Sequence, residues 1–323
     1  MKKSGIGGVG DLRSEQWTLQ APDGVKIHVY EWLPEKDPWG VVQIAHGMVE
    51  HGLRYQRFAE ALTKEGLAVF ANDHRGHGKT AKSEDEKGHF ADENGWDIAI
   101  GDMKQLNDVI RNRFPKLPII LFGHSLGSFL SRRYAQLYGN SISALILSGT
   151  GGNPGFAGSL GLLVAKREIR KKGKRAKSDL MNKLIFGGYN KAFQPARTPF
   201  DWLSRDPSEV DQYIQDPDCG FLASTTFYAD LIKGLKELDR PEWLNRMPKD
   251  LPVLFISGDQ DPVGANGRGV KQVYRNFKKV GMTDVTCKLY EGGRHELLNE
   301  TNRMEVMRDI VQWIDEHINK TLS

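Results

Sequence analysis

Gly123-His124-Ser125-Leu126-Gly127 is the stretch of sequence that decides the fold of this chain. The apolar run 117–122 precedes it, and a helix-like segment, 128–135, follows it. This order predicts a strand, a tight turn in which glycines flank a serine, and then a helix. Such a turn lifts the serine hydroxyl clear of the sheet, where a base can activate it as a nucleophile. We therefore predict a nucleophile elbow at Ser125 rather than an ordinary turn with a capping serine.

A serine nucleophile on such a turn needs an acid and a histidine, which follow it along the chain in that order. Only two of the nine histidines come after Ser125. His317 lies near the end of a run with helical apolar spacing, and we expect a solvated helix end there. His295 lies on a glycine-rich loop after the strand-like run 285–290. We therefore predict that His295 is the catalytic base.

The acid is expected after the preceding strand. The apolar run 253–257 is typical of a buried parallel strand, and Asp259 and Asp261 follow it. The first aspartate of such a loop more often caps the turn by bonding its own backbone. The second is held by the rigid Pro262, so we prefer Asp261. The 34 positions between Asp261 and His295 leave room for one helix, 267–279, and one strand.

Two backbone N–H groups must stabilise the oxyanion that forms during acyl transfer. One is expected from Leu126, the residue after the nucleophile. The other is expected from Met48, in the loop that follows the strand-like run 41–45. We expect His46 to hold this loop by hydrogen bonds.

Strand-like and helix-like runs alternate through the first half of the chain. Runs 15–20 and 26–32 predict an antiparallel pair joined at Asp23-Gly24. Predicted strands at 41–45, 67–72, 119–122 and 144–148 then alternate with predicted helices at 55–64, 96–113 and after Ser125. This pattern predicts an α/β fold with a mostly parallel central sheet and helices on both faces. We expect residues 1–150 and 240–323 to form this catalytic core.

The alternation stops near Gly149 and resumes near Pro252, and we interpret residues 151–239 as an inserted, mainly helical cap. The segment begins with an apolar, flexible stretch, 156–165. The basic run Lys166 to Lys177 follows, with eight basic residues and one acid. An apolar stretch beside a basic one is typical of a surface that rests on an anionic bilayer, although a solvated loop has the same composition.

Binding of nucleic acid is not expected, because the basic run has no recognisable nucleic-acid-binding fold around it. Aromatic residues at irregular spacing follow in the predicted cap. They either line a tunnel for an acyl chain or form the small core of the cap itself. They are Tyr189, Phe193, Phe200, Trp202, Phe221, Phe227 and Tyr228.

Composition is that of an ordinary globular protein. The 323 residues are 39% hydrophobic and 27% charged, with a net charge of +4. Cys219 and Cys287 are too few for a disulfide framework and indicate a reducing compartment. Residues 1–10 lack the apolar stretch of a secretory signal, and no segment is apolar enough to span a bilayer. We expect a cytoplasmic protein with peripheral membrane contact through the cap.

The chain resembles the monoacylglycerol lipase and lysophospholipase group of α/β-hydrolases, also described as serine aminopeptidase-like. The matching motifs are His46-Gly47-Met48-Val49-Glu50-His51 with Arg54-Tyr55, Asp73-His74-Arg75-Gly76-His77-Gly78, Gly123 to Gly127, Gly258 to Asp261, and Gly293 to His295. The resemblance implies Ser125, Asp261 and His295 as a triad, with Met48 and Leu126 as oxyanion donors. The predicted cap matches poorly.

The resemblance also implies that Glu50 and Arg54 lie near the glycerol end of the substrate, although a structural ion pair is the simpler interpretation. Those lipases often carry a second histidine three residues after the catalytic one, where this chain has Leu298. His74 and His77 flank a glycine-rich turn, which we favour over a metal site. Neither a metal nor a cofactor is expected.

These residues together predict a serine hydrolase that cleaves carboxylic esters of acyl lipids. Monoacylglycerol or lysophospholipid is the expected substrate, through an acyl-enzyme on Ser125. A thioesterase or an aminopeptidase with the same triad is an alternative, and so is a non-catalytic ligand-binding protein. The intact serine, acid and histidine argue against the last, although a fold alone never establishes an activity.

Overall fold

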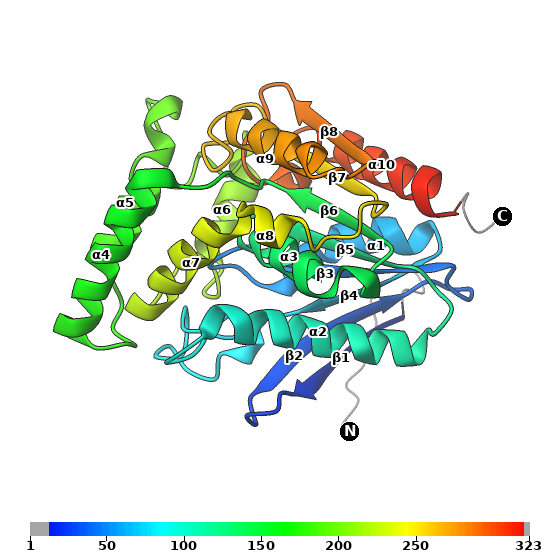
Figure 1. The fold of residues 1–323 in the computed structure, drawn as a ribbon, viewed down its shortest axis with the longest axis horizontal. Helices are drawn as coiled ribbons and strands as arrows, with labels where there is room; N and C mark the ends of the chain where they lie inside the picture. The colour runs from blue at the N-terminus through cyan, green and yellow to red at the C-terminus, as the bar shows by residue number, and fades with distance from the viewer. Residues whose placement is uncertain (1–12, 320–323) are drawn as a thin grey trace.

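A mixed sheet of eight strands forms the centre of the molecule, which a computed structural model describes for residues 13–319 (Figure 1). The strand pair at one edge, β1 and β2, is antiparallel, and β2 also runs antiparallel to its other neighbour. All remaining pairs are parallel. The order across the sheet is β1 (Arg13–Gln20), β2 (Lys26–Leu33), β4 (Leu67–Asn72), β3 (Gly40–Ala45), β5 (Ile119–His124), β6 (Ala144–Ser148), β7 (Val253–Gly258) and β8 (Val285–Tyr290).

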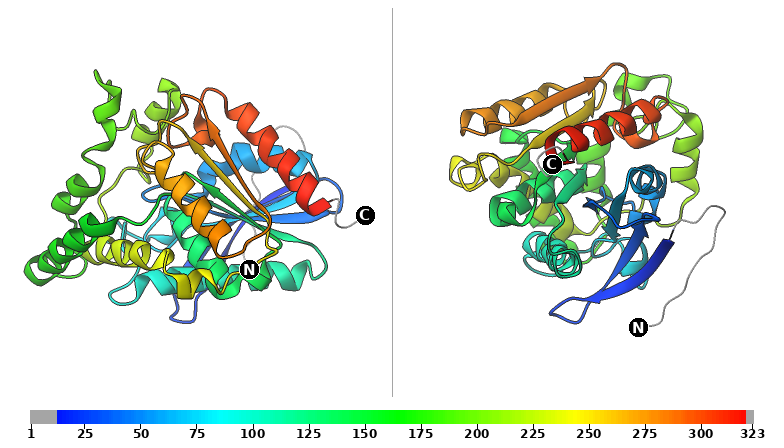
Figure 2. Two further views of the ribbon diagram at one scale, coloured as in Figure 1. Left: turned by 45° about the horizontal axis from the view of Figure 1, so that its top comes forward. Right: turned by 90° about the vertical axis from the view of Figure 1, so that its right-hand side faces the viewer.

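Helices cover both faces of this sheet (Figure 2). Successive strand residues point to opposite faces, so in β5 the side chains of Ile119 and Leu121 enter one core and those of Ile120 and Phe122 enter the other. The first core lies under α2 (Gly95–Arg113), α3 (Leu126–Tyr138) and α9 (Arg268–Lys279). The second lies under α1 (Gln56–Lys64) and α10 (Arg303–Ile314). The predicted α/β architecture is therefore confirmed.

The chain between β6 and β7 holds five further helices, four of them within residues 151–239, which we call the insertion. They are α4 (Gly155–Lys172), α5 (Asp179–Phe186), α6 (Pro207–Gln215), α7 (Thr225–Leu238) and the short α8 (Pro241–Leu244). In Figure 1 the α4 and α5 helices stand at the left edge, away from the sheet.

The expectation of a flexible stretch at residues 156–165 is wrong, because these residues lie within α4. Its glycines allow close helix packing instead. A Cβ atom at Gly161 would lie 3.3 Å from the side chain of Ile232 on α7, which is tighter than most real contacts. The small residues therefore let α4 and α7 approach each other.

The C-terminal helix ends as the sequence predicts, but His317 does not stand free in solvent. It lies in a short π-helical turn, Asp315–Asn319, and its ring stacks on Trp313 with 4.5 Å between centroids. The prediction about residues 1–10 falls outside the described residues. Among residues 13–319, every helix is too short or too polar to cross a lipid bilayer.

Candidate active site

Ser125 occupies the sharp turn between β5 and α3. Its backbone has φ 50° and ψ −117°, a conformation that L residues rarely adopt, and its N–H donates to the Ser148 carbonyl at 2.9 Å. The flanking glycines are needed because the chain is crowded here. A Cβ at Gly123 would lie 2.5 Å from the Gly127 carbonyl oxygen, and one at Gly127 would lie 2.0 Å from the Ala45 oxygen. Strain of this kind is typical of functional sites.

Asp261 and His295 lie in contact, although 34 residues separate them. The Nδ1 of His295 is 3.0 Å and 2.9 Å from the two carboxylate oxygens of Asp261, and both side chains are buried. Asp261 also accepts from the Val263 N–H at 2.9 Å, which orients its carboxylate. Because Nδ1 binds the acid, Nε2 is the nitrogen left for a serine.

Asp259 does not cap its own turn, as the sequence suggested it would, but bonds a neighbouring loop. Its Oδ1 accepts a hydrogen bond from the Gly292 N–H at 2.8 Å, and its side chain is half-buried. It therefore links the two loops that carry Asp261 and His295. This geometry favours Asp261 over Asp259 as the partner of the histidine.

The ring of His295 is enclosed on several sides. Its centroid lies 4.7 Å from that of His124 and 5.1 Å from that of Trp202, which belongs to the insertion. Burial lowers the pKa of His295, but the charge and hydrogen bond of Asp261 outweigh this effect and raise it above the usual value. Asp261 therefore favours the protonated form of the His295 imidazole.

The loop after β3 packs directly on the nucleophile. A Cβ at Gly47 would lie 3.3 Å from the Cβ of Ser125, so only glycine fits this approach. The Nε2 of His46 accepts from the His74 N–H at 2.9 Å, so its Nδ1 carries the proton that is donated to the Gly47 carbonyl at 2.7 Å. His46 thus holds the loop, as predicted. Met48 lines the space beside Ser125.

Glu50 and Arg54 form an ion pair at 2.5 Å, and a third residue, Glu296, completes it. Arg54 donates to both oxygens of Glu296, at 2.8 and 2.7 Å. Burial raises the pKa of Glu50 despite the nearby guanidinium. Burial also opposes ionisation of Glu296, but Arg54 outweighs it and lowers the pKa to about 2. Arg54 therefore bridges the two glutamates: its Nη1 bonds both Glu50 and Glu296, and its Nη2 bonds Glu296.

Sequence reasoning missed Glu296 and the contribution of Tyr213. The phenol of Tyr213, on α6, donates to the Val49 carbonyl at 3.2 Å, and its ring lies 4.9 Å from the Arg54 guanidinium. Glu296 is adjacent to His295 in sequence, which is the one signal that pointed to it. Its pairing with Arg54 spans 242 positions and follows no local pattern.

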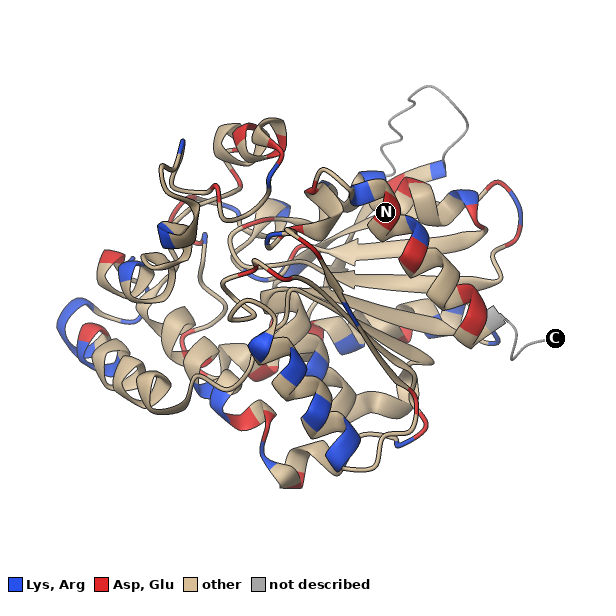
Figure 3. Ribbon diagram, turned by 90° about the horizontal axis from the view of Figure 1, so that it is seen from above, with Lys and Arg blue, Asp and Glu red and all other residues tan. Residues whose placement is uncertain are grey.

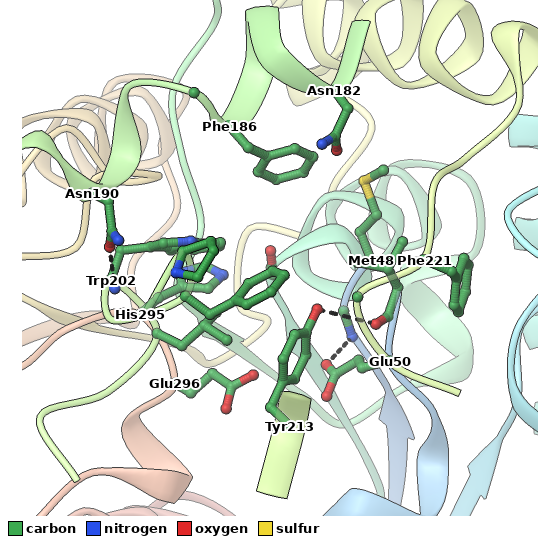
Figure 4. A pocket seen from close by; sticks show the side chains of 18 of the residues that line it. Met48, Glu50, Asn182, Phe186, Asn190, Trp202, Tyr213, Phe221, His295 and Glu296 are labelled. Atoms are coloured by element: carbon green, nitrogen blue, oxygen red, sulfur yellow. Dashed lines mark hydrogen bonds between the residues drawn. The ribbon is translucent and has the colours of Figure 1, made fainter. Parts of the chain in front are cut away.

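Two cavities of about 320 Å³ each meet at Ser125. The first, which we call the polar cavity after its two carboxylates, has Glu50 and Glu296 on one side and Phe186 on another, and most of its remaining wall is apolar or aromatic (Figure 4). The second, which we call the apolar cavity, extends toward the α7 helix. Its apolar lining residues are Met48, Leu126, Phe129, Ile185, Phe186, Leu231, Leu235 and Val263.

The aromatic residues noted in the sequence of the insertion serve both as a lining of the site and as a small core of the insertion. Phe200, Trp202 and Phe221 line the polar cavity. Trp202 also packs with Tyr189 and Phe193 in a small apolar cluster. The same side chains therefore form both a core for the insertion and a wall for the site.

His46, His74 and His77 form a buried cluster, with 4.2 Å between the first two ring centroids and 5.3 Å between the first and third. Burial lowers the pKa of all three, to about 3 for His74 and about 4 for His77. His77 Nδ1 lies 2.8 Å from the Arg75 carbonyl. The turn is thus stabilised by neutral imidazoles, in line with the predicted structural role.

A family model described as "Serine aminopeptidase, S33" matches residues 36–302. This chain belongs to that family. A monoacylglycerol lipase of Mycolicibacterium smegmatis is 31% identical over 96% of this chain and 100% of its own length. A monoglyceride lipase of Rattus norvegicus is 29% identical over 92% of this chain and 89% of its own.

Solved structures agree with this assignment. A thermostable carboxyl esterase from Bacillus coagulans, in complex with glycerol, has a TM-score of 0.88 at 31% identity, covering 94% of this chain and 99% of its own. A lipase described as the open form has a TM-score of 0.86 at 27% identity, with 95% and 99% covered. The fold is therefore an α/β-hydrolase fold, and the chain is a hydrolase of the esterase and lipase family.

Proposed function

We propose that this protein hydrolyses carboxylic esters of acyl lipids through an acyl-enzyme on Ser125. The observation that carries the proposal is the meeting of two cavities at that residue, only the first of which has carboxylates, those of Glu50 and Glu296, in its wall. An ester carbonyl held at Ser125 would place a hydrocarbon chain in the apolar cavity. The alcohol part of the substrate would then lie against the carboxylates of the polar cavity. A single site thus matches both halves of an acyl lipid.

The reaction follows from the geometry. His295 Nε2 takes the proton of the Ser125 hydroxyl as Oγ attacks the carbonyl carbon. Asp261 holds the imidazole and stabilises its positive charge, while the N–H groups of Met48 and Leu126 bind the oxyanion. The alcohol leaves with the proton from His295. Water, deprotonated by the same histidine, then hydrolyses the acyl-enzyme.

The polar cavity favours a neutral polyol over a phosphate ester. Glu50 and Glu296 present oxygen acceptors to it, while Arg54 lines a small neighbouring cavity and is already bonded to both. Glycerol hydroxyls can donate to these oxygens. A phosphodiester has only acceptors and carries a negative charge, so it would be repelled. We therefore infer that monoacylglycerol is preferred to lysophospholipid. The similar proteins of Mycolicibacterium smegmatis and Rattus norvegicus are described as monoacylglycerol and monoglyceride lipases, which supports this inference.

We also propose that the insertion acts as a cap that rests on the membrane holding the substrate. Phe156, Leu160 and Leu163 share one face of α4 and are 85%, 55% and 64% exposed. Leu180 and Leu184 on α5 are exposed as well. Together they are five of the nine large apolar side chains that are exposed among residues 13–319. Such a concentration marks a contact surface.

Part of the basic run Lys166 to Lys177 supports this docking, and part does not. Lys172, Lys174 and Arg175 form ion pairs with acidic residues, so their charges are compensated. Lys166, Arg167, Arg170 and Lys171 have no carboxylate within ion-pair distance among the described residues, and they lie at the end of α4 that follows the apolar face. Figure 3 shows Lys and Arg concentrated at the left edge of the molecule. These four residues of α4 would meet anionic headgroups while the apolar face enters the lipid.

A panel of matched substrates tests the proposal. Hydrolysis of a monoacylglycerol, a lysophospholipid and an acyl-CoA with the same acyl chain would be measured, beside aminoacyl-arylamides. Wild-type protein would be compared with Ser125→Ala, which removes the nucleophile and leaves the fold. We expect the monoacylglycerol to give the highest kcat/KM and the alanine variant to lose about six orders of magnitude.

Each other outcome has a distinct meaning. Preference for the lysophospholipid would refute the assignment of the polar cavity but keep the ester hydrolase. Preference for acyl-CoA would indicate a thioesterase with the same triad instead of an ester hydrolase. Preference for an arylamide would indicate an aminopeptidase with that triad. Equal activity of the alanine variant would refute the role of Ser125 altogether.

A further inference from the structure

Three side chains that bind metals well lie together at the seam between the sheet-bearing part and the insertion. The Nε2 of His51 is 2.8 Å from Oδ2 of Asp216. The sulfur of Cys219 joins them, and the three donor atoms all lie within 4.8 Å of one another. His51 belongs to the loop after β3, whereas Asp216 and Cys219 follow α6. Because 165 positions separate His51 from Asp216, no motif in the sequence announces this cluster.

The cluster is largely shielded from solvent, and within the described part of the chain the sulfur of Cys219 has no competing hydrogen-bond partner. His51 and Asp216 expose only 10% and 30% of their side chains. The Cys219 sulfur has no hydrogen-bond partner among residues 13–319, and burial raises the pKa of this thiol. Burial also opposes ionisation of Asp216, but its bond to His51 and the Asp218 N–H lower its pKa below the usual value. An anionic oxygen is thus present beside a neutral sulfur.

The charge around the cluster suits a cation. Arg54 and Lys87 are nearby positive groups, but Glu50 and Glu296 both bind Arg54, and Glu84 and Asp218 both bind Lys87. These four carboxylates and the cluster's own Asp216 therefore outnumber the two positive groups.

We propose that His51, Asp216 and Cys219 form a binding site for a thiophilic divalent cation, of which Zn²⁺ is the best fit. Zn²⁺ accepts imidazole, carboxylate and thiolate together, with bonds of about 2.0–2.3 Å. Tetrahedral donors at those bond lengths lie roughly 3.3–3.8 Å apart. The His51–Asp216 pair, now 2.8 Å apart, must therefore open by less than about 1 Å, and the sulfur, within 4.8 Å of both, must move inward by at most about 1.3 Å. The thiol proton is released to solvent as the metal–sulfur bond forms, and a fourth position remains open to water.

A metal at this position would join two segments that already touch. The N–H of Gly220 donates to the Val49 carbonyl at 2.9 Å, and the same carbonyl accepts from Tyr213. Val49 is the neighbour of Met48, the proposed oxyanion donor. The bound cation would therefore fasten the chain after α6 to the loop beside Ser125. Because the donors come together only in the folded protein, it would also raise thermal stability.

Titration with Cd²⁺ tests the site directly, because a cadmium–thiolate bond has its own ultraviolet absorption. We expect one equivalent to bind per chain with this band present, and Zn²⁺ to displace it. Cys219→Ser should abolish the band and lower the affinity for Zn²⁺ at least about tenfold. Cys287→Ser, which removes the other free thiol, should change neither quantity.

The second ligand is tested by Asp216→Asn, which keeps the size of the side chain and removes its charge. Its affinity for Zn²⁺ should also fall at least about tenfold, while its melting temperature without metal shows that it folds. A band that persists in Cys219→Ser, a band lost in Cys287→Ser, or the absence of stoichiometric binding would overturn the site. None of these readouts uses catalysis, so they are independent of the proposed ester hydrolysis.

Discussion

Every residue of the five inner strands, β3 to β7, is buried, whereas the α4 and α5 helices expose large apolar side chains to solvent. The sheet fixes three loops that carry Ser125, Asp261 and His295, and its close-packed interior tolerates little movement. The insertion instead supplies the walls of the two cavities and an apolar outer face. The difference indicates that the core determines the chemistry and the insertion determines which molecules reach it.

The two parts also differ in how they are tied together. Arg294, next to the proposed catalytic base His295, donates to the carbonyl of Ser204 at 3.0 Å, and Glu296 N–H donates to that of Leu203 at 2.8 Å. Arg205 of the insertion pairs with the buried Glu300 at 2.8 Å. The loop of His295 is therefore braced by the insertion, while the loops of Ser125 and Asp261 are braced by the sheet. Of the three proposed triad residues, His295 is thus the one whose loop a change in the insertion would disturb most directly.

The largest effect within the core is expected from Asp261→Asn. The amide cannot hold the imidazole of His295 in the correct tautomer or stabilise its charge, so kcat should fall by about four orders of magnitude. Asp259→Asn is the matched control, because it makes the same change two residues away. It should retain most of its activity, since Asp259 bonds only the loop backbone and Gln260. The two variants would be compared by steady-state kinetics on a soluble ester. If Asp259→Asn lost its activity and Asp261→Asn kept it, the assignment of the acid would be reversed.

The next largest effect is expected at Glu296, in the wall of the polar cavity that the core and the insertion form together. Glu296→Gln should raise KM for a monoacylglycerol about ten- to a hundredfold, because it removes a charged acceptor for the glycerol hydroxyls and frees Arg54. Activity toward a lysophospholipid should rise relative to wild type, since the guanidinium can then meet a phosphate. Activity on a p-nitrophenyl ester, which has no glycerol, serves as the control. An equal loss on all three substrates would mean that Glu296 only positions His295.

A smaller effect is expected at the outer face of the insertion. Changing both Leu160 and Leu163 to Asp should lower hydrolysis of vesicle-borne monoacylglycerol about tenfold, because the apolar face of α4 can no longer enter the bilayer. Hydrolysis of a soluble short-chain ester should not change.

A charge-matched control is available on α9. Lys271→Gln with Arg275→Gln also lowers the net charge by two, on an exposed helix outside the insertion. This variant should keep wild-type activity on vesicles. If both double variants lost vesicle activity equally, net charge rather than the α4 face would control docking.

The smallest effect is expected in stability at acidic pH, which should fall for the core rather than for the insertion. Burial lowers the pKa of His46, His74, His77 and His124, so the folded core keeps them neutral while the unfolded chain protonates them below pH 6.5. Their stabilisation is therefore complete above pH 6.5 and is lost as the pH falls toward about 4, by up to about 1.4 kcal/mol per pH unit for each.

Burial also lowers the pKa of His28 and His89, so the raised pKa of His295 acts in the opposite sense as one group against six. The insertion contains no histidine. Calorimetric melting at pH 7 and pH 5 should thus show a lower melting temperature in acid, carried by the core. A melting temperature that stayed constant over this range would contradict the neutral state of the buried imidazoles.

Sequence patterns predicted the core well because its rules are local. A short apolar run marks each inner strand, and strained turns such as that at Ser125 require glycines that can be read directly. Asp261 and His295 were found from chain order alone, and the structure brings them to 2.9 Å. Their catalytic roles remain a proposal that the variants above test.

The insertion was harder to predict because its contacts are not local. Glycines in α4 suggested flexibility, yet they pack against α7, and that contact cannot be read from either segment. The composition of the basic run is typical of a membrane-facing surface or a solvated loop, yet Arg175 is paired with Asp92 and Lys174 with Glu93, about 80 positions away. Glu296 and Cys219 likewise acquire their partners only when the two parts of the chain meet.

Covalent trapping of the acyl-enzyme tests the central claim most directly. Wild-type protein would be treated with a fluorophosphonate that carries a long alkyl chain, and the modified peptide would be identified by mass spectrometry. We predict one adduct per chain, on Ser125, formed more slowly in the presence of monoacylglycerol and absent from Ser125→Ala. Labelling of another residue, or labelling that monoacylglycerol does not slow, would contradict the account.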